Sequence, residues 1–454
     1  MKTRQIIVCG FLTVILALAF TTCDNDTDDG SNSDYWKITW NLDGGTFASG
    51  SNHPTQIEKD AVLAKPSPDP TKDGNPFGGW YANSGLTQAY NFASPVTADL
   101  NLYAKWNPPP VEITVTAGST LAEKLKWVED NAQSNAIYFI KVNDDESIAS
   151  SQSLSYTNKS GITIHLEGID GEKIISLSSK GPLFTLYTAT LILDNNITLQ
   201  GISDKSSALV MIMSGTFEMR KGAKISGGTS WTGGGIAVSS NGTFTMNGGE
   251  ISNNSASIHG GGVYVENGGT FIMNDGKISD NNGGQTGGGV EVFGTFTMNG
   301  GVISGNATVS YFGGGIYVGH STNSIFTMNG GEISGNTASS FGGGVFVGGI
   351  FTMKGGEISG NTVQAGLSSS GGGVYIGTDA FFRIVTGTVY GSNESNTSLR
   401  NTANDGGAAL HMSTISTPVG TAQYGTFSGE TWTSAGDLST TNDTIKVVNG
   451  VLQE

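Results

Sequence analysis

Two carboxylates, Glu332 and Glu357, open the same Glu-Ile-Ser tripeptide in two successive stretches of the chain. If these stretches stack as neighbouring strands, the carboxylates lie about 5 Å apart, close to the separation used by retaining glycosidases. Neither Arg nor His recurs beside them, and duplication of a unit copies its charges along with its fold. We therefore expect no catalytic residue and keep a carbohydrate-active enzyme as the alternative.

A set of aromatic residues follows a Gly-Gly-Gly-Val or Gly-Gly-Gly-Ile motif, always at the same position. A column of outward-facing rings would suit stacking on sugars or docking of a protein partner. Stacked like residues can also simply stabilise a sheet face, and that alternative stays open. The candidate ligand-contact residues are Tyr264, Tyr317, Phe346 and Tyr375.

The remaining reactive groups argue against metal, cofactor and nucleic-acid chemistry. The five histidines are scattered without metal-ligand spacing, and we find no Ser-His-Asp order, phosphate-binding loop or calcium nonapeptide. With 22 Lys and Arg against 38 Asp and Glu, the net charge is −16 and no basic block is present. We expect no metal, no cofactor and no nucleic-acid partner.

The elements that would position these side chains come from an internal repeat. Glycine supplies 69 of 454 residues, roughly twice its usual share. A Thr-Phe-Thr-Met-Asn-Gly-Gly-Glu-Ile-Ser sequence returns with small changes about every 27 residues, most clearly over 215–390. Each unit holds three short strand patterns bounded by turn residues. The repeat predicts an all-β, right-handed parallel β-helix over residues 119–454, in which residues 137–452 leave room for about 12 coils.

Alternation within the strands assigns their faces. Phe244, Met246 and Ile251 are expected inside, whereas Thr245 and Tyr264 are expected outside. Asparagines after the third strand of each unit are expected to form a stacked amide column at a corner. That column comprises Asn254, Asn281, Asn306, Asn336 and Asn361.

A helix is expected to close the first coil. Thr120-Leu121-Ala122-Glu123 is a capping box that opens an amphipathic helix extending to about Gln133. Such a helix would cover strand edges that are otherwise prone to aggregation. The Gly-Gly-Gly-[Ile/Val] and Ile-Ser-Gly-Asn motifs resemble those of polymorphic membrane proteins and other pectate-lyase-like β-helix surface proteins. Repeats of this kind specify a fold far better than a function.

Residues 36–106 form a separate small module. Trp36, Ile38, Trp40 and Leu42 alternate with polar residues and lead into an Asp-Gly-Gly turn. Together with Phe-Gly-Gly-Trp-Tyr at 77–81 and Ala-Lys-Trp at 104–106, this pattern resembles the Listeria–Bacteroides repeat of internalin-type surface proteins. The resemblance implies a β-grasp-like spacer or contact module without a catalytic centre. A Pro-rich linker, residues 107–118, should follow it.

The start of the chain predicts export. Residues 1–22 combine a basic start with an uncharged apolar run too short to span a bilayer, as in a signal peptide. The sequence Phe-Thr-Thr-Cys ending at Cys23 resembles the lipobox of bacterial lipoproteins, which implies lipid attachment at Cys23. The alternative is an ordinary secretory signal followed by a stray cysteine. Residues 23–35 are acidic and polar, as expected of a tether.

These patterns together predict a non-catalytic, adhesin-like lipoprotein of the cell envelope. We expect it on the outer membrane, exposed at the surface and attached to the membrane through its lipid. Its extended β-helix would contact a host or matrix protein or a glycan. The identity of that ligand is not encoded in any motif of the sequence.

Overall fold

The computed structural model describes residues 34–149, 151–202, 207–364, 370–403, 407–412, 421–429 and 431–453. The predicted signal peptide 1–22, Cys23 and nearly all of the predicted tether lie outside these residues. The chain divides into two compact units, and the boundary between them in the sequence falls between Pro109 and Pro110.

The first unit is built on a small mixed sheet of four strands in the order β2-β1-β4-β3. The central pair, β1 and β4, is parallel, and both outer pairs are antiparallel. Trp80 is buried at the centre and packs against Trp40 with ring centroids 4.7 Å apart, so it serves as core. The strands are β1 (Tyr35–Asn41), β2 (Gln56–Glu58), β3 (Phe77–Tyr81) and β4 (Leu100–Trp106).

The motif residues of this unit have structural roles. Trp106 donates its indole N–H to the carbonyl of Leu42 at 2.7 Å, which ties the last strand to the Asp-Gly-Gly turn. A Cβ atom at Gly45 would lie 2.2 Å from the Trp106 ring, so only glycine fits there. Asp99 accepts a hydrogen bond from the backbone N–H of Lys37 at 2.8 Å.

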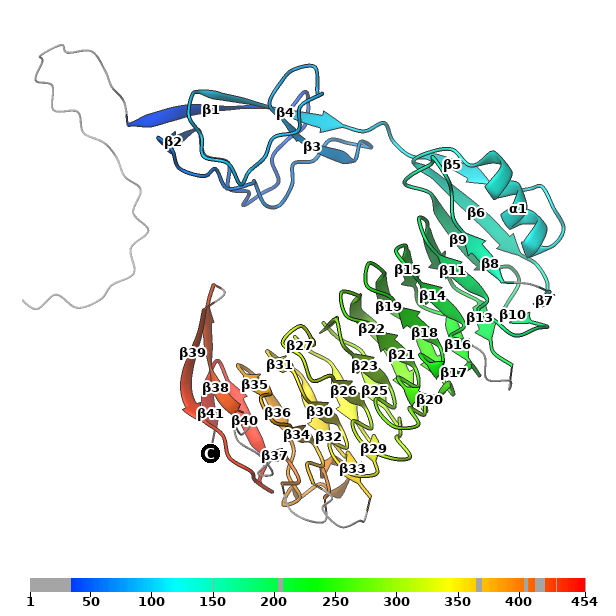
Figure 1. The fold of residues 1–454 in the computed structure, drawn as a ribbon, viewed down its shortest axis with the longest axis vertical. Helices are drawn as coiled ribbons and strands as arrows, with labels where there is room; N and C mark the ends of the chain where they lie inside the picture. The colour runs from blue at the N-terminus through cyan, green and yellow to red at the C-terminus, as the bar shows by residue number, and fades with distance from the viewer. Residues whose placement is uncertain are drawn as a thin grey trace, which may run out of the picture. The chain divides into compact units, whose positions relative to one another are not determined.

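The second unit is a parallel β-solenoid of about ten turns, stacked from cyan to orange in Figure 1. One face is a ten-stranded parallel sheet to which each turn contributes one short strand. Its strands are β8 (Gln152–Leu154), β11 (Phe184–Leu186), β14 (Val210–Ile212), β18 (Ile236–Val238), β21 (Val263–Val265), β23 (Val290–Val292), β26 (Ile316–Val318), β30 (Val345–Val347), β34 (Val374–Ile376) and β37 (Leu410–Met412).

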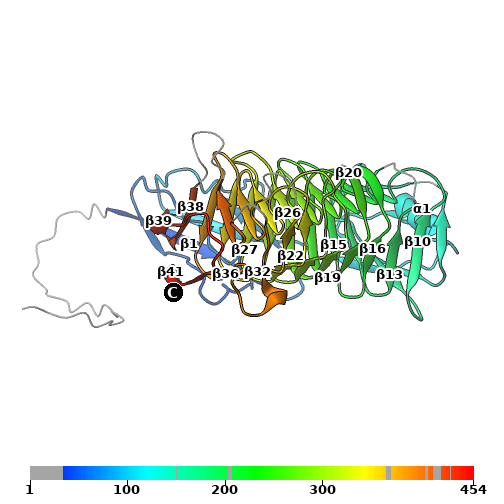
Figure 2. The ribbon, with the colours of Figure 1, turned by 90° about the horizontal axis from the view of Figure 1, so that it is seen from below.

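The other two rows of strands form one long sheet, and in two coils the rows merge into a single strand. Figure 2 shows the same stack from below. The first row contains β6 (Ala136–Val142), β9 (Thr163–Gly168), β12 (Thr190–Leu193), β15 (Thr216–Met219), β19 (Thr243–Ser252), β22 (Thr270–Ser279), β24 (Thr295–Met298), β27 (Ile325–Met328), β31 (Ile350–Met353) and β35 (Phe381–Ile384). The second row adds β7 (Glu146–Ile148), β10 (Lys173–Leu177), β13 (Ile197–Gln200), β16 (Lys224–Ser226), β25 (Val302–Ser304), β28 (Glu332–Ser334), β32 (Glu357–Ser359) and β36 (Gly387–Val389).

The interior confirms the predicted alternation. Phe244, Met246 and Ile251 are fully buried, and each lies in register with its equivalents in the neighbouring coils. The phenylalanines form one continuous stack with centroid separations of 4.5–5.4 Å from Phe217 to Phe382. Because one coil cannot bury such rings alone, neighbouring coils stabilise one another.

The predicted asparagine column is also present and fully hydrogen-bonded along its length. Each side-chain amide bonds to the next asparagine at 2.9–3.0 Å, from Asn254 to Asn361. A sixth member, Asn401, continues the column, and the sequence repeat had not revealed it because 40 residues separate it from Asn361. Two-stranded corners lie beside the column: β17 (Thr229–Thr232) with β20 (Ser255–His259), and β29 (Thr337–Ala338) with β33 (Thr362–Val363).

The first coil is closed as predicted. The helix α1 (Leu121–Asn131) begins with the Thr120–Glu123 capping box and buries Leu121, Leu125 and Val128. It packs against β6, β7 and β8. The Pro-rich linker is shorter than predicted, because β5 (Val111–Thr114) pairs in parallel with β6 and belongs to the solenoid.

The last part of the chain departs from the prediction of about 12 coils. Beyond β38 the described strands pair antiparallel in place of further coils. Only β38 continues the ladder, in parallel with β35. This segment lacks the Gly-Gly-Gly and Phe-x-Met motifs that drive stacking. Its elements are β38 (Thr421–Ser428), β39 (Thr431–Asp437), β40 (Ile445–Val448) and β41 (Val451–Gln453), and the short 3-10 helix η1 (Thr397–Leu399) precedes β37.

Candidate functional site

The candidate aromatic residues occupy the central position of successive strands in the ten-stranded sheet. In each three-residue strand the first and third side chains enter the core, so the middle one points away from it. Tyr317, Phe346 and Tyr375 are in register, with centroids 5.1 and 5.3 Å apart. The predicted column therefore exists. Its members in chain order are Ala237, Tyr264, Glu291, Tyr317, Phe346, Tyr375 and His411.

The expectation that this column is an exposed strip is wrong for three of the four candidates. Tyr317, Phe346 and Tyr375 are only 7, 3 and 4% exposed. Residues that precede the Gly-Gly-Gly motif cover them: Phe312 stacks on Phe346 at 4.7 Å, and Phe341 packs on Tyr375 at 4.5 Å. A phenylalanine directly before two of the Gly-Gly-Gly motifs, at positions 312 and 341, was the sequence signal for this cover. We call the six residues Phe293, Phe312, Tyr317, Phe341, Phe346 and Tyr375 the outer aromatic cluster.

Tyr264, the fourth candidate, is half-buried at the edge of this cluster. Its ring lies 6.0 Å from Phe293 and 6.0 Å from His259. Burial, together with the nearby Glu291 carboxylate, raises the pKa of Tyr264 to about 12. Its hydroxyl therefore stays protonated at neutral pH and keeps a hydrogen to donate.

Glu291 interrupts the aromatic column with a fully buried carboxylate. Its Oε1 lies 2.8 Å from Nδ1 of His259, and its Oε2 accepts hydrogen bonds from the Thr286 hydroxyl at 2.7 Å and the Gly260 N–H at 3.0 Å. Burial raises the pKa of Glu291, and the contact with Glu291 raises the pKa of His259. The sequence analysis did not predict the pairing of His259 with Glu291. The feature that could have revealed it is the single acidic residue at a position that is aromatic in the neighbouring coils.

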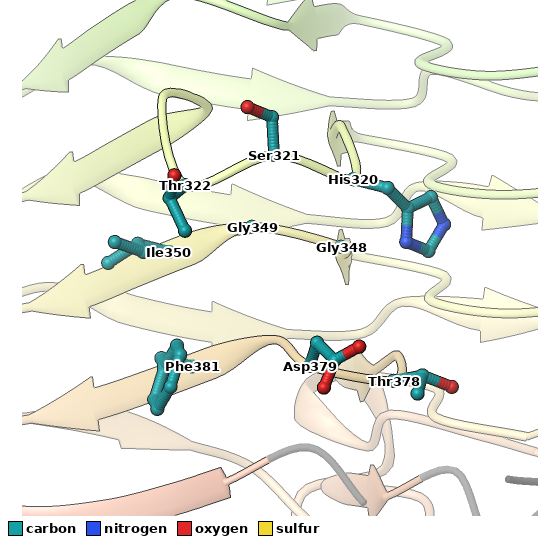
Figure 3. A pocket seen from close by; sticks show the side chains of 9 residues that line it. All are labelled: His320, Ser321, Thr322, Gly348, Gly349, Ile350, Thr378, Asp379 and Phe381. Carbon is teal, nitrogen blue, oxygen red and sulfur yellow. The ribbon is translucent and has the colours of Figure 1, made fainter. Parts of the chain in front are cut away.

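A notch opens beside the outer aromatic cluster, where the chain passes from the ten-stranded sheet to the next strand (Figure 3). The turn at residues 319–324 is long, the equivalent turn in the next coil consists only of Gly348 and Gly349, and the following turn at residues 377–380 is longer again. The short turn between two longer ones leaves a cavity of about 300 Å³. We call this cavity the notch. It is lined by His320, Ser321, Thr322, Gly348, Gly349, Ile350, Thr378, Asp379 and Phe381.

The walls of the notch are chemically mixed. Figure 3 shows His320, Thr378 and Asp379 toward one end, and Ile350 and Phe381 toward the other. The imidazole of His320 contacts the edges of the cluster, with centroids 6.3 Å from Tyr317 and 5.6 Å from Phe346. Burial against these rings lowers the pKa of His320, so the imidazole is neutral at pH 7.

The two carboxylates considered for catalysis are brought together, but away from the notch. Glu332 and Glu357 are exposed and in register on the neighbouring strands β28 and β32 of the long sheet. Among the described residues, no group of three or more His, Cys, Asp or Glu side chains is arranged to hold a metal ion. The absence of metal and cofactor stays a prediction.

Within the part of the chain that the structure describes, no helix has the length and apolar character needed to cross a bilayer. Cys23, the predicted lipid-attachment residue, precedes the first described residue, so its role stays a prediction.

Two proteins of Evansella cellulosilytica share partial similarity with this chain. One, whose name describes a Gly-rich membrane protein, is 33% identical over 104 residues, which cover 22% of this chain and 12% of the relative. The other, named as a membrane protein, is 35% identical over 92 residues, which cover 18% of this chain and 14% of the relative. The matched parts thus span about an eighth of each relative's length. No solved structure matches the chain. Residues 36–105 match the model of the Listeria-Bacteroides repeat domain, so the small N-terminal unit is a repeat of that family, as its motifs predicted.

Proposed function

We propose that this chain is a non-catalytic, adhesin-like lipoprotein of the cell envelope, held at the outer membrane through Cys23. Its solenoid displays a contact surface for a host or matrix protein or a glycan. The repeat domain at 36–105 and the membrane-protein names of the partial relatives support an envelope location. The lipobox-like sequence before Cys23 supports the lipid anchor.

One observation carries the assignment of the contact surface. The long turn at 319–324 and the notch beside it interrupt the stack of coils next to the outer aromatic cluster. Insertions on one side of a solenoid commonly mark its binding face. The cluster itself is buried and supports this face, whereas Tyr264 and the walls of the notch remain accessible for contact.

Protease treatment of intact cells tests the location. Cells that express the full chain should lose the protein when protease is added outside, and a Cys23→Ser variant should instead be released into the medium or periplasm. The same cells, applied to an array of matrix proteins and glycans, test the contact function. Protection from external protease, or equal array binding by cells with and without the protein, would contradict the proposal.

A second candidate is a carbohydrate-active enzyme, favoured by the register of Glu332 with Glu357. Neighbouring strands place such carboxylates roughly 5 Å apart, the spacing of a retaining glycosidase. Cleavage of a polysaccharide by the purified chain, lost in both Glu332→Gln and Glu357→Gln variants, would establish this activity in place of the non-catalytic role.

A further inference from the structure

The notch is large enough to hold one small ring. Its volume of about 300 Å³ is at the lower end of the range of ligand pockets, ~300–1,000 Å³, so it accepts a single sugar residue in preference to a segment of chain. Its floor is the Gly348-Gly349 backbone, which leaves the space between the two longer turns open.

The floor requires glycine for steric reasons. A Cβ atom at Gly348 would lie 2.9 Å from the His320 ring, and one at Gly349 would lie 2.5 Å from the carbonyl oxygen of Ser321. Any larger residue would push the wall of the notch outward. The strands on either side of the notch are anchored by fully buried core residues. The notch is therefore formed before a ligand arrives, and binding costs little entropy for ordering its walls.

The lining matches the two-sided chemistry of a pyranose. Phe381, 36% exposed, and Ile350 provide an apolar wall for the C–H face of a sugar ring. The carboxylate of Asp379 provides acceptors for sugar hydroxyls, whereas the Ser321 hydroxyl already accepts a hydrogen bond from the N–H of Asn323 at 3.1 Å and points away from the floor in Figure 3. A mainly apolar pocket with a few placed polar groups is typical of small-molecule sites.

Charge narrows the ligand class. Asp379 is the one acidic residue among those that line the notch, and the neutral His320 adds no positive charge. The whole chain carries a net charge of −16. Carboxylate-bearing sugars such as uronic or sialic acids would meet like charge at the site, which disfavours them. A neutral hexose meets no such repulsion.

We propose that the notch binds one neutral hexose residue, at the end of a glycan or as the free sugar. The inference rests on the proposed contact function and gives that function a site and a ligand class. The Asp379 carboxylate accepts hydrogen bonds from the sugar hydroxyls, while Phe381 packs against the apolar face of the sugar. His320 accepts or donates one further hydrogen bond across the floor.

The test uses the purified full chain carrying Cys23→Ser, applied to an array of glycans ending in neutral hexoses or in acidic sugars. Thr322→Trp fills the notch from its exposed rim, and Asn323→Trp places the same bulk on the same turn, outside the lining. We expect at least a tenfold loss of neutral-glycan binding for Thr322→Trp and none for Asn323→Trp. Asp379→Asn keeps the side-chain shape at a positive φ of 58° and should weaken binding about tenfold.

Free methyl hexosides, added at saturating concentration, test whether the notch also binds the free sugar or only a hexose at the end of a glycan. Displacement of the bound glycan supports recognition of a single residue in the notch. Binding that free hexosides leave in place, binding that survives Thr322→Trp, or a preference for acidic sugars would overturn the inference. Thermal melting and circular dichroism verify that each variant is folded.

These outcomes are distinguishable from failure of the proposed function. Cells that bind a matrix protein while the purified chain ignores every hexose would retain the contact function and refute the hexose site. Purified protein that binds hexoses through the notch, from cells that protect it against external protease, would retain the site and refute the surface location.

Discussion

Replacing Asn306 with alanine should be among the most damaging single changes in the solenoid. Asn306 is fully buried, and its Oδ1 accepts hydrogen bonds from the backbone N–H of Asn281 at 3.0 Å and from the side-chain amide of Asn281 at 2.9 Å. Its own amide donates to the carbonyl of Ile278 and to Oδ1 of Asn336, both at 2.9 Å. Alanine removes all of these bonds at once.

The magnitude follows from the donors left without partners. Two buried N–H groups of Asn281 lose their acceptor, and each orphaned group costs about 1–3 kcal/mol. We therefore expect Asn306→Ala to lower the local stability of the neighbouring coils by about 4 kcal/mol. Because coils contact only their neighbours, the loss should be confined to strands near β25.

Asn299 is the matched control in the same coil. It belongs to an outer asparagine ladder and bonds to Asn274 and Asn329, each at 2.7 Å, but it is exposed. Water replaces these partners when the side chain is removed, so Asn299→Ala should cost about 0.5 kcal/mol or less. The two variants differ mainly in burial.

Hydrogen exchange measured by mass spectrometry can read the opening free energy of β22, β25 and β28 separately. This resolution matters because a chain with two units and stacked coils need not unfold in one step. If the two alanine variants lower the opening free energy equally, or Asn306→Ala lowers it by less than about 1 kcal/mol, the buried ladder is not a major source of stability.

Three further predictions concern the outer face. Phe346→Ala should destabilise the solenoid by about 3–5 kcal/mol in urea unfolding by leaving a cavity in the outer aromatic cluster, whereas a loss of binding with unchanged stability would mean that Phe346 contacts the ligand directly. Because Glu291 raises the pKa of His259, the stabilisation from protonated His259 is present below its usual pKa of about 6.5 and is lost as the pH rises through the higher folded value. The melting temperature of the parent should therefore exceed that of His259→Gln most at pH 6 and less at pH 9, and a gap that is constant or widens with pH would contradict the pairing. Gly348→Ala should displace the His320 ring and change its NMR titration, while Gly335→Ala, at a position with open space but a positive φ of 64°, should leave that titration unaltered.

The features that depend on residues close together in the sequence could be predicted from the repeat and its motifs. The Phe-x-Met alternation determined which side chains enter the core, because period-two strands allow only one register that buries them all. The asparagine column and the capping box at Thr120 were likewise predictable, since each depends on a motif and its immediate neighbours. The number of coils was overestimated, because length alone does not reveal that the strands after β38 pair antiparallel.

What only the tertiary structure decided was exposure on the outer face. The sequence placed Tyr317, Phe346 and Tyr375 outside the coil, correctly, but whether an outward ring meets solvent depends on what the neighbouring turn lays over it. Phe312 and Phe341 cover these rings from the preceding corner, and His259 reaches Glu291 from another coil. The notch likewise exists only because turns of unequal length stack in space. A repeat determines what each coil buries within itself, whereas a site formed between coils depends on contacts that no single unit contains.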